Sequence, residues 1–271
     1  MPALLVYRRG DRGRVVADIQ RAVGVTADGI YGPNTEAAVR AFQANQGLVV
    51  DGIAGPKTLT AAGVHPVAGV DVSGWNSPLD WHQAYAGGIR FAFVKATEGQ
   101  TFTSKVCRGH VLGAQSAGVK AGVYHFATAS DSIKDAEAEA KHCHAVASAI
   151  GKMDLPPVLD IESDPARLST AKLTEWCEAW CATSAALWGR APIVYTYKAF
   201  LGEFAAGSPL FQRPLWIARL TSANDPGTVS PWPTWAIWQH HISSSVPGAT
   251  GKTDLNWLAG GPQALEALCK S

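Results

Sequence analysis

The chain has 271 residues, of which 47% are hydrophobic and 17% are charged, and its formal net charge is +1. This composition is typical of a globular protein with a substantial core, and the length suits one large domain or a small domain followed by a medium-sized one. The near-neutral charge argues against a nucleic-acid partner. No run approaches the ~18 consecutive apolar residues of a transmembrane helix, so we expect no membrane insertion.

An internal repeat marks the first part of the chain. Residues 28–35, DGIYGPNT, recur as residues 51–58, DGIAGPKT. Each copy is typical of an Asp-Gly turn, a tight glycine and a proline in the first turn of a helix. Apolar residues at helical spacing predict helices over about 14–23 and 34–46. We expect a small domain of three helices, residues 1–66.

Strand-like and helix-like segments alternate after a short junction. Helices are predicted over 133–150 and 171–188. Apolar runs predict strands near 68–72, 91–96, 121–126, 156–160 and 192–196. This alternation indicates parallel strands joined by crossover helices.

Past residue 200 the pattern changes. Strands are predicted near 214–218, 235–239 and 253–256, with connections rich in Pro, Gly and Ser that leave no room for full-length helices. We therefore expect residues 67–271 to form an α/β domain, an incomplete TIM-like barrel of five β/α units plus three strands.

The most informative motif is Asp160-Ile161-Glu162, which closes the apolar run 155–159. Positions i and i+2 of a strand point the same way, so both carboxyl groups would face one cavity. Two acids held that close do not both ionise easily. A protonated acid beside an ionised one is what cleavage of a glycosidic bond requires. The alternative is a surface loop with two solvated acids.

Two further acids fall at or near strand ends, Asp71 and Asp254. The C-terminal ends of barrel strands line the active sites of such folds. Each acid alone could be a helix cap or a turn residue. Together with Asp160 and Glu162 they form a candidate catalytic set from three strands.

Six short motifs occur in a fixed order along this region. They are VDVSGW (70–75), FAFVKATEG (91–99), GVYHF (122–126), VLDIE (158–162), WQ (238–239) and TDLNW (253–257). In order and spacing they resemble the glycoside hydrolase family 25 lysozymes, also called muramidases, over about residues 67–260. Residues 1–65 resemble a small helical peptidoglycan-binding domain. The resemblance implies hydrolysis of the β-1,4 bond between N-acetylmuramic acid and N-acetylglucosamine.

The resemblance also implies roles for the acids. Glu162 is expected to be the general acid, with a raised pKa, and later to activate water. Asp160 is expected to stay ionised and to orient the substrate's own 2-acetamido group as it attacks the anomeric carbon, a known exception to the two-carboxylate rule. The competing scheme is direct attack by water with inversion, using Asp71 or Asp254 as the base. Both schemes stay open.

Several residues are candidates for substrate binding. Tyr124 and Gln239 end their strands, and three tryptophans could offer ring faces to sugar C–H groups unless they simply fill the core: Trp75, Trp216 and Trp238. In the N-terminal domain, Tyr31 and Asn34 are candidate wall contacts. Lys95 and Glu98 could pair with each other or shape the cleft.

We expect no metal and no cofactor. The five cysteines lack CxxC spacing, so buried free thiols are favoured over a metal site. The histidines lack the spacing of a zinc site.

The N-terminus lacks the basic start and the apolar core of ~7–15 residues of a secretory signal. We therefore expect a monomeric phage endolysin, made in the host cytoplasm without a signal peptide, whose partner is the peptidoglycan of the cell wall. A bacterial autolysin, a virion-associated lysin or secretion by a non-standard route are alternatives. The rival functions are a wall-binding protein without activity and a zinc amidase or peptidase acting on stem peptides.

Overall fold

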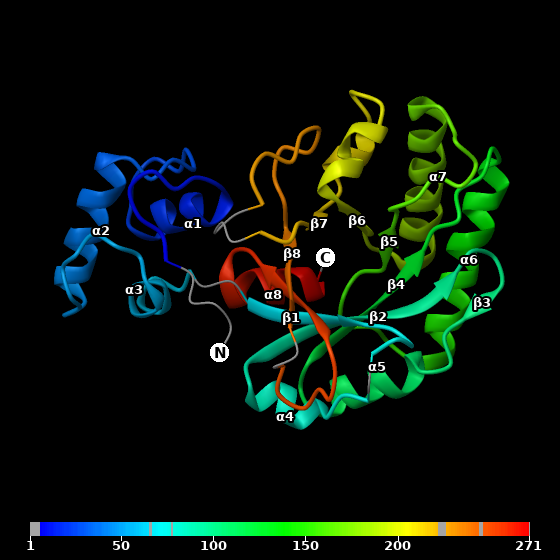
Figure 1. The fold of residues 1–271 in the computed structure, drawn as a ribbon, viewed down its shortest axis with the longest axis horizontal. Coiled ribbons are helices and arrows are strands. Elements are labelled where there is room, and N and C mark those ends of the chain that lie inside the picture. The colour runs from blue at the N-terminus through cyan, green and yellow to red at the C-terminus, as the bar shows by residue number, and fades with distance from the viewer. Residues whose placement is uncertain (1–5, 65–66, 77, 222–225, 244–245, 271) are drawn as a thin grey trace.

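The computed structural model describes residues 6–64, 67–76, 78–221, 226–243 and 246–270. Figure 1 shows three short helices grouped to one side of a larger barrel. Within the described residues, no helix has the length and apolar character needed to cross a membrane.

The N-terminal helices are α1 (Arg14–Ala22), α2 (Pro33–Asn45) and α3 (Pro56–Ala61), and the last two begin at the prolines of the repeat. This confirms the expected helical N-terminal region. Side chains from each part of it meet in a small core that includes Tyr7, Ile19, Tyr31, Val39 and Leu59.

A glutamine holds each of the two repeated turns. The side-chain amide of Gln20 donates to Asp28 Oδ1 at 2.7 Å and accepts from the backbone of Gly29 at 2.8 Å. Gln43 repeats the arrangement one motif later, donating to Asp51 Oδ1 at 2.8 Å and accepting from the Gly52 backbone at 2.9 Å. Both turn glycines have a φ of 71°, which a residue with a side chain rarely adopts. The sequence repeat therefore codes for one turn built twice.

Eight strands close into a barrel, which confirms the predicted fold class. In chain order they are β1 (Val67–Val72), β2 (Ile89–Glu98), β4 (Lys120–Phe126), β5 (Val158–Asp160), β6 (Ile193–Tyr197), β7 (Leu215–Ala218), β8 (Ile237–Ser243) and β9 (Thr253–Leu258). Pairing of β1 with β2 closes the ring, and the short β3 (Phe102–Thr103) extends β2 at one edge.

The strand directions decide which residues meet. The pairs from β1–β2 round to β7–β8 are parallel, whereas β9 runs antiparallel to both of its neighbours, β8 and β1. The edge that carries the C-terminal ends of seven strands therefore carries the N-terminal start of β9. Asp254, the second residue of β9, reaches this edge from the opposite direction to the other acids.

Four α-helices cover the outside of the first half of the barrel (Figure 1): α4 (Trp81–Ala86), α5 (Cys107–Ser116), α6 (Ile133–Ile150) and α7 (Thr170–Trp188). After β6 the chain makes two short 3₁₀ helices, η1 (Lys198–Glu203) and η2 (Pro209–Gln212), in place of a fifth α-helix. The barrel is thus incomplete, as expected. The connection from β6 to β7 consists of 3₁₀ helices instead of the α-helix of a fifth full β/α unit.

Apolar side chains fill the barrel below its C-terminal edge. A buried cluster inside the sheet includes Phe91, Phe93, Leu155, Ile193 and Trp216. The last helix, α8 (Gly261–Lys270), was not predicted and packs Leu265 against the same cluster. These side chains fill the barrel interior, so a ligand that reaches the acids enters from the edge where they gather.

Candidate active site

A cavity of about 370 Å³ opens at the C-terminal edge of the barrel. All four predicted acids line it: Asp71, Asp160, Glu162 and Asp254. The residues that complete the lining are Ser73, Trp75, Lys95, Tyr124, Phe126, Tyr195, Trp216, Gln239 and Ile242.

The Asp160–Glu162 pair is placed by the end of β5. The strand ends at Asp160, and the next backbone N–H, that of Ile161, donates to Tyr195 O at 3.0 Å, which prolongs the extended chain along β6. Ile161 is fully buried on the outer side, and the two acids beside it turn toward the cavity. Asp160 is 7% exposed and Glu162 is half-buried. The structure therefore places these acids in a shared hollow and not on a solvated loop.

Asp160 has an unsatisfied oxygen. Within the described residues, its Oδ1 atom is buried and has no hydrogen-bond partner. A buried carboxylate oxygen without a donor is costly, by about 1–3 kcal/mol or more for a charged group. The oxygen is therefore available to a donor that a ligand brings.

Burial and crowding raise the pKa values of both acids at the end of β5. For Asp160, burial raises the pKa well above its ordinary value, and the charges of Glu162 and Asp71 add to the effect, while Lys95 opposes it. For Glu162, burial raises the pKa, Lys95 lowers it, and Asp254 raises it. Burial and the neighbouring anions therefore favour a protonated acid in this group, as a general acid requires.

Asp71 and Asp254 lie directly opposite each other on β1 and β9. Burial and the Asp254 charge raise the pKa of Asp71, whereas hydrogen bonds from Asn256 and Gln239 lower it. Burial also raises the pKa of Asp254. The four acids thus form one coupled group in which the charge of each depends on the others.

Two side-chain amides converge on one oxygen of Asp71. Asn256 Nδ2 donates to Asp71 Oδ2 at 2.8 Å, and Gln239 Nε2 donates to the same atom at 2.9 Å. Behind them, Trp216 Nε1 donates to Asn256 Oδ1 at 2.8 Å, and Tyr195 OH donates to Gln239 Oε1 at 3.0 Å.

The sequence reasoning missed Asn256 and Tyr195. Asn256 lies two residues after Asp254, so strand periodicity gives both the same face and could have indicated it. Tyr195 points into the barrel from β6, but its partner Gln239 belongs to β8, which is not adjacent in the sheet. No local sequence pattern predicts the hydrogen bond between Tyr195 and Gln239.

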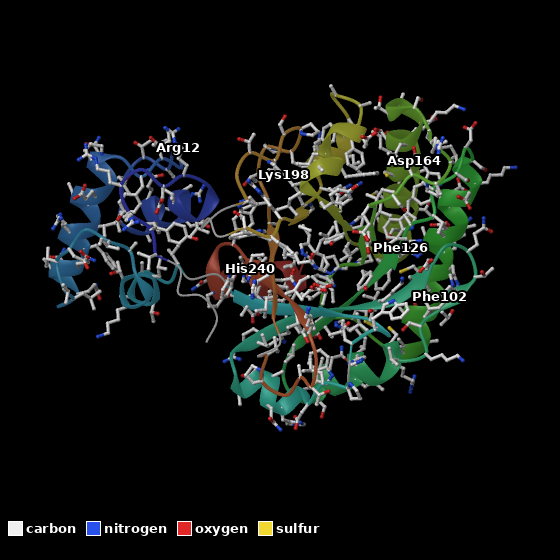
Figure 2. The ribbon with its side chains drawn as sticks, viewed as in Figure 1. Arg12, Phe102, Phe126, Asp164, Lys198 and His240 are labelled. Atoms are coloured by element: carbon white, nitrogen blue, oxygen red, sulfur yellow. The ribbon has the colours of Figure 1, made fainter. Side chains whose placement is uncertain are left out.

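Lys95 is the one cationic side chain among the described residues that line the cavity. Its Nζ atom lies 2.7 Å from Glu98 Oε2, 4.6 Å from the ring centroid of Phe126 and 5.6 Å from that of Phe102. Figure 2 shows both phenylalanines on the β2–β4 side of the barrel. Both predicted roles therefore apply: Lys95 pairs with Glu98, and Lys95 also lines the cavity.

Four of the predicted substrate-binding residues line the cavity: Tyr124, Gln239, Trp75 and Trp216. Trp75 is 95% exposed, so its ring faces are open at the mouth. Trp216 is only 2% exposed, and its ring packs against Phe93 and Tyr195 with centroids 5.0 and 4.8 Å away. Trp216 therefore lines the cavity with a ring that its neighbours largely cover, and its role in substrate binding stays a prediction.

Trp238 lies outside the cavity lining. It alternates with Gln239 along β8, so its ring takes the other side of the strand, where it is 2% exposed and donates from Nε1 to Arg219 O at 2.9 Å. The expected stacking role for Trp238 is therefore corrected by strand alternation.

The two N-terminal candidates differ in exposure. Tyr31 is 1% exposed, and its hydroxyl donates to Gly52 O at 2.9 Å, so it joins the two repeated turns from within the core. Asn34 is exposed in the first turn of α2. Burial thus removes Tyr31 from the candidate wall contacts and leaves Asn34.

Comparison with known proteins identifies the family. Residues 70–249, more than half of the chain, match the family model for glycosyl hydrolases family 25, and the chain belongs to this family. Residues 16–62 match PG_binding_1, a family of peptidoglycan binding domains.

Several relatives are named as lysozymes or muramidases. Lysozyme M1 of Streptomyces globisporus is 30% identical over 221 residues, which cover 79% of this chain and 75% of the relative. An N,O-diacetylmuramidase of Chalaropsis sp is 31% identical over 213 residues, covering 74% of this chain and 98% of the relative. The crystal structure of a bacterial lysozyme from Streptomyces coelicolor matches with a TM-score of 0.65 and 29% identity, covering 76% of this chain and 97% of that one. The chain is therefore a glycosidase of the lysozyme family, and its substrate is peptidoglycan.

Proposed function

We propose that this glycosidase cleaves the β-1,4 bond between N-acetylmuramic acid and N-acetylglucosamine, with Glu162 as the general acid. Glu162 is half-buried at the cavity wall, and burial and Asp254 raise its pKa. A carboxylic acid with a raised pKa keeps its proton more readily and can give it to the glycosidic oxygen. In the second half of the reaction the same group, now ionised, activates water.

The observation that carries the proposal is the buried, unpartnered Oδ1 atom of Asp160 in the same hollow as Glu162. The 2-acetamido group of an N-acetylated sugar brings an amide N–H, which is the donor that this oxygen lacks. Accepting that bond orients the acetamido oxygen toward the anomeric carbon and stabilises the positive charge that develops on the group. The site therefore favours substrate assistance over a second protein nucleophile.

Direct attack by water with inversion is the second candidate, with Asp71 or Asp254 as the base. It is supported by the amide hydrogen bonds on Asp71, which stabilise an ionised carboxylate. The two schemes differ in the first-formed product. NMR of the released sugar shows a retained anomeric configuration in the acetamido scheme and an inverted one under direct attack.

Around the reacting sugar, Tyr124 and Gln239 are proposed to form hydrogen bonds, and the exposed ring of Trp75 is proposed to pack against sugar C–H groups. Substituting Trp75 by alanine then raises KM on glycan fragments without shifting the pH profile. An unchanged KM would remove Trp75 from the binding surface.

We further propose that residues 1–66 bind the cell wall and that residues 67–271 carry the catalysis, with Asn34 near the wall contact. Tethering to an insoluble polymer raises the effective substrate concentration without any new catalytic contact. Pull-down of each part with purified sacculi tests this division.

The biological setting that we propose is that of a monomeric phage endolysin, made in the host cytoplasm, which reaches the wall once the membrane is opened. A bacterial autolysin is the alternative; an autolytic lysozyme of Clostridium acetobutylicum is 26% identical over 199 residues. Expression inside a susceptible cell separates the two settings. Lysis that waits for a membrane-permeabilising agent supports the endolysin, and lysis without one supports an exported autolysin.

Two rival activities are tested together. A wall-binding protein without activity would bind sacculi and release no reducing ends. A zinc amidase or peptidase would release new amino termini and would stop in strong chelator. The proposal requires new reducing sugars, no new amino termini, and activity that persists in chelator.

A further inference from the structure

Asn256 and Gln239 donate to the same oxygen of Asp71, but their orientations are fixed in different ways. An amide side chain can present either its NH₂ group or its oxygen to a neighbour. Only the NH₂ orientation stabilises an ionised Asp71. Whatever fixes the orientation of the amide therefore also favours the ionised form of this acid.

The hydrogen-bond partner of Asn256 on the side away from Asp71 permits only one orientation of the amide. The indole N–H of Trp216 is a donor and never an acceptor, so Asn256 must turn its oxygen toward Trp216. Its NH₂ group then faces Asp71. The contact joins β7 to β9, which are not neighbours in the sheet, across the barrel interior. Trp216 and Asn256 are 2% and 0% exposed, so water does not supply a substitute partner.

The hydrogen-bond partner of Gln239 on the side away from Asp71 permits both orientations of the amide. The hydroxyl of Tyr195 donates to Gln239 Oε1 in this structure, but a phenol hydroxyl also accepts. Gln239 could therefore turn over, giving its NH₂ group to Tyr195 and its oxygen to a protonated Asp71. The chain thus places a fixed donor and a reversible donor side by side on one carboxylate oxygen.

We propose that Trp216 is a positioning residue of the active site, which by donating to Asn256 holds Asp71 as an anion. This rests on the proposed function, in which an ionised Asp71 either acts as the base or stabilises positive charge on the reacting sugar. Trp216 does not touch the substrate in this account. The ring of Trp216 is buried, and its indole N–H donates to Asn256, so this N–H gives the side chain a role other than sugar stacking.

The charged and titratable groups around Asp71 act on it from several strands. Asp254 faces it from β9, Asp160 and Glu162 from the end of β5, Tyr124 from β4 and Tyr195 from β6. Lys95 lines the same cavity from β2. Burial, Asp254 and Glu162 raise the pKa of Asp71 and the two amide donors lower it, so losing one donor shifts the balance toward the protonated acid.

The test compares three single variants and one double variant of the full chain. The variant Trp216→Phe keeps an aromatic ring and removes the donor, and Asn256→Leu removes the amide itself. We expect each to move the acidic limb of kcat/KM against pH upward by about one pH unit, the scale of one hydrogen bond to a charged group. Because Trp216 acts through Asn256, the double variant should shift no further than Asn256→Leu alone.

Tyr195→Phe is the matched comparison, since it removes a hydroxyl that does not force its amide to one orientation. Its shift should be smaller than that of Trp216→Phe. The proposal is overturned if Trp216→Phe leaves the acidic limb in place, if the effects of Trp216→Phe and Asn256→Leu multiply, or if KM rises with an unmoved pH profile. The last result would make Trp216 a sugar-binding residue.

Thermal unfolding of each variant shows whether it is folded under assay conditions. If Trp216→Phe does not fold, Asn256→Leu and Asn256→Asp carry the test, because neither changes the aromatic cluster; an unmoved acidic limb in both overturns the proposal. The wild-type chain separates this proposal from the proposed function. Failure of the wild-type chain to release reducing sugars contradicts the function, whereas normal release with an unmoved limb in the variants contradicts only the role of Trp216.

Discussion

Asp71 and Asp254 are paired residues on β1 and β9, so two carboxyl groups stand opposite each other at the edge where the substrate enters. Like charges placed directly across a sheet are destabilising. The pair exists because β9 runs antiparallel and brings its first residues to the edge where the other strands end. The site therefore concentrates negative charge at a cost in stability, and several measurable consequences follow from that.

Glu162→Gln should abolish lysis while wall binding stays intact. The substitution keeps the shape of the side chain and removes the proton that the leaving oxygen needs, so kcat should fall by at least about 10²–10⁴-fold. Release of reducing sugars from sacculi measures the loss, and co-sedimentation with sacculi measures binding. Glu137→Gln, a similar change on the outer side of α6, serves as the control and should leave both unchanged. Turnover within a few-fold of wild type would exclude Glu162 as the acid.

Asp160→Asn should stabilise the protein at neutral pH while it inactivates the enzyme. The pKa of Asp160 is raised in the folded state, so between its ordinary value of 3.8 and the raised value the folded chain binds more protons than the unfolded chain. Stability therefore falls as pH rises through this window, and the amide removes the penalty.

Thermal unfolding of Asp160→Asn and wild type at pH 7 and at pH 3 measures this effect. The variant should unfold at a higher temperature at pH 7, by about 2–4 °C for each kcal/mol gained, and the difference should vanish near pH 3. A lower unfolding temperature at pH 7 would mean that the Asp160 charge is well paired in the folded state.

Lys95→Met should move the whole pH profile toward higher pH. The ammonium group lowers the pKa values of Asp160 and Glu162, so its removal lets both rise. The acidic limb then moves up because Asp160 ionises later, and the basic limb moves up because Glu162 keeps its proton longer. Profiles of kcat/KM on soluble fragments measure both limbs. Lys141→Met on the surface of α6 is the control, and unmoved limbs in Lys95→Met would limit Lys95 to its pairing with Glu98.

A fully buried chain of polar groups ties α6 to the barrel below the site. His125 Nε2 lies 2.7 Å from Glu139 Oε2, and His125 Nδ1 lies 2.8 Å from Thr97 Oγ1. The order hydroxyl, imidazole, carboxylate is that of a catalytic triad. All three side chains are 0% exposed, so no substrate reaches them and the group supports the structure.

Glu139→Gln should therefore lower the free energy of unfolding by about 1–3 kcal/mol, the cost of leaving a buried polar group without its hydrogen-bond partner. Thr97→Val should keep near-wild-type kcat at temperatures where it is folded, because its hydroxyl takes no part in the reaction. Denaturant unfolding measures the free energy of unfolding of Glu139→Gln, and single-turnover assays measure the catalytic rate of Thr97→Val. Loss of kcat in a folded Thr97→Val chain would contradict a purely structural role.

The sequence alone predicted the four acids because strand periodicity and strand ends are local features. It did not reveal that β9 runs antiparallel and so brings its start to this edge, since that direction depends on pairing with β1 and β8. It also could not rank the tryptophans. Trp75 is exposed, whereas Trp216 and Trp238 are buried. The residues that bury these two side chains include ones far from them in the sequence. Tyr195 was missed because its partner meets it across the barrel interior, whereas the periodicity of β9 could have indicated Asn256.

Deleting residues 1–66 should weaken activity on whole sacculi while it spares small soluble glycan fragments. The catalytic cavity is lined only by residues from Asp71 onward among those described, so the chemistry does not need the N-terminal helices. Rates on the two substrates, with thermal unfolding of the truncated chain as a control, measure the difference. An equal loss on both would mean that the helices support the barrel itself.

A protonated carboxylic acid at the mouth of the barrel is proposed to cleave the glycan strand of the wall. Mass spectrometry of the fragments released from purified sacculi tests it most directly, because it identifies the broken bond. The released muropeptides should carry N-acetylmuramic acid at the new reducing end and intact stem peptides. Fragments with new amino termini and uncut glycan, or with N-acetylglucosamine at the reducing end, would contradict it.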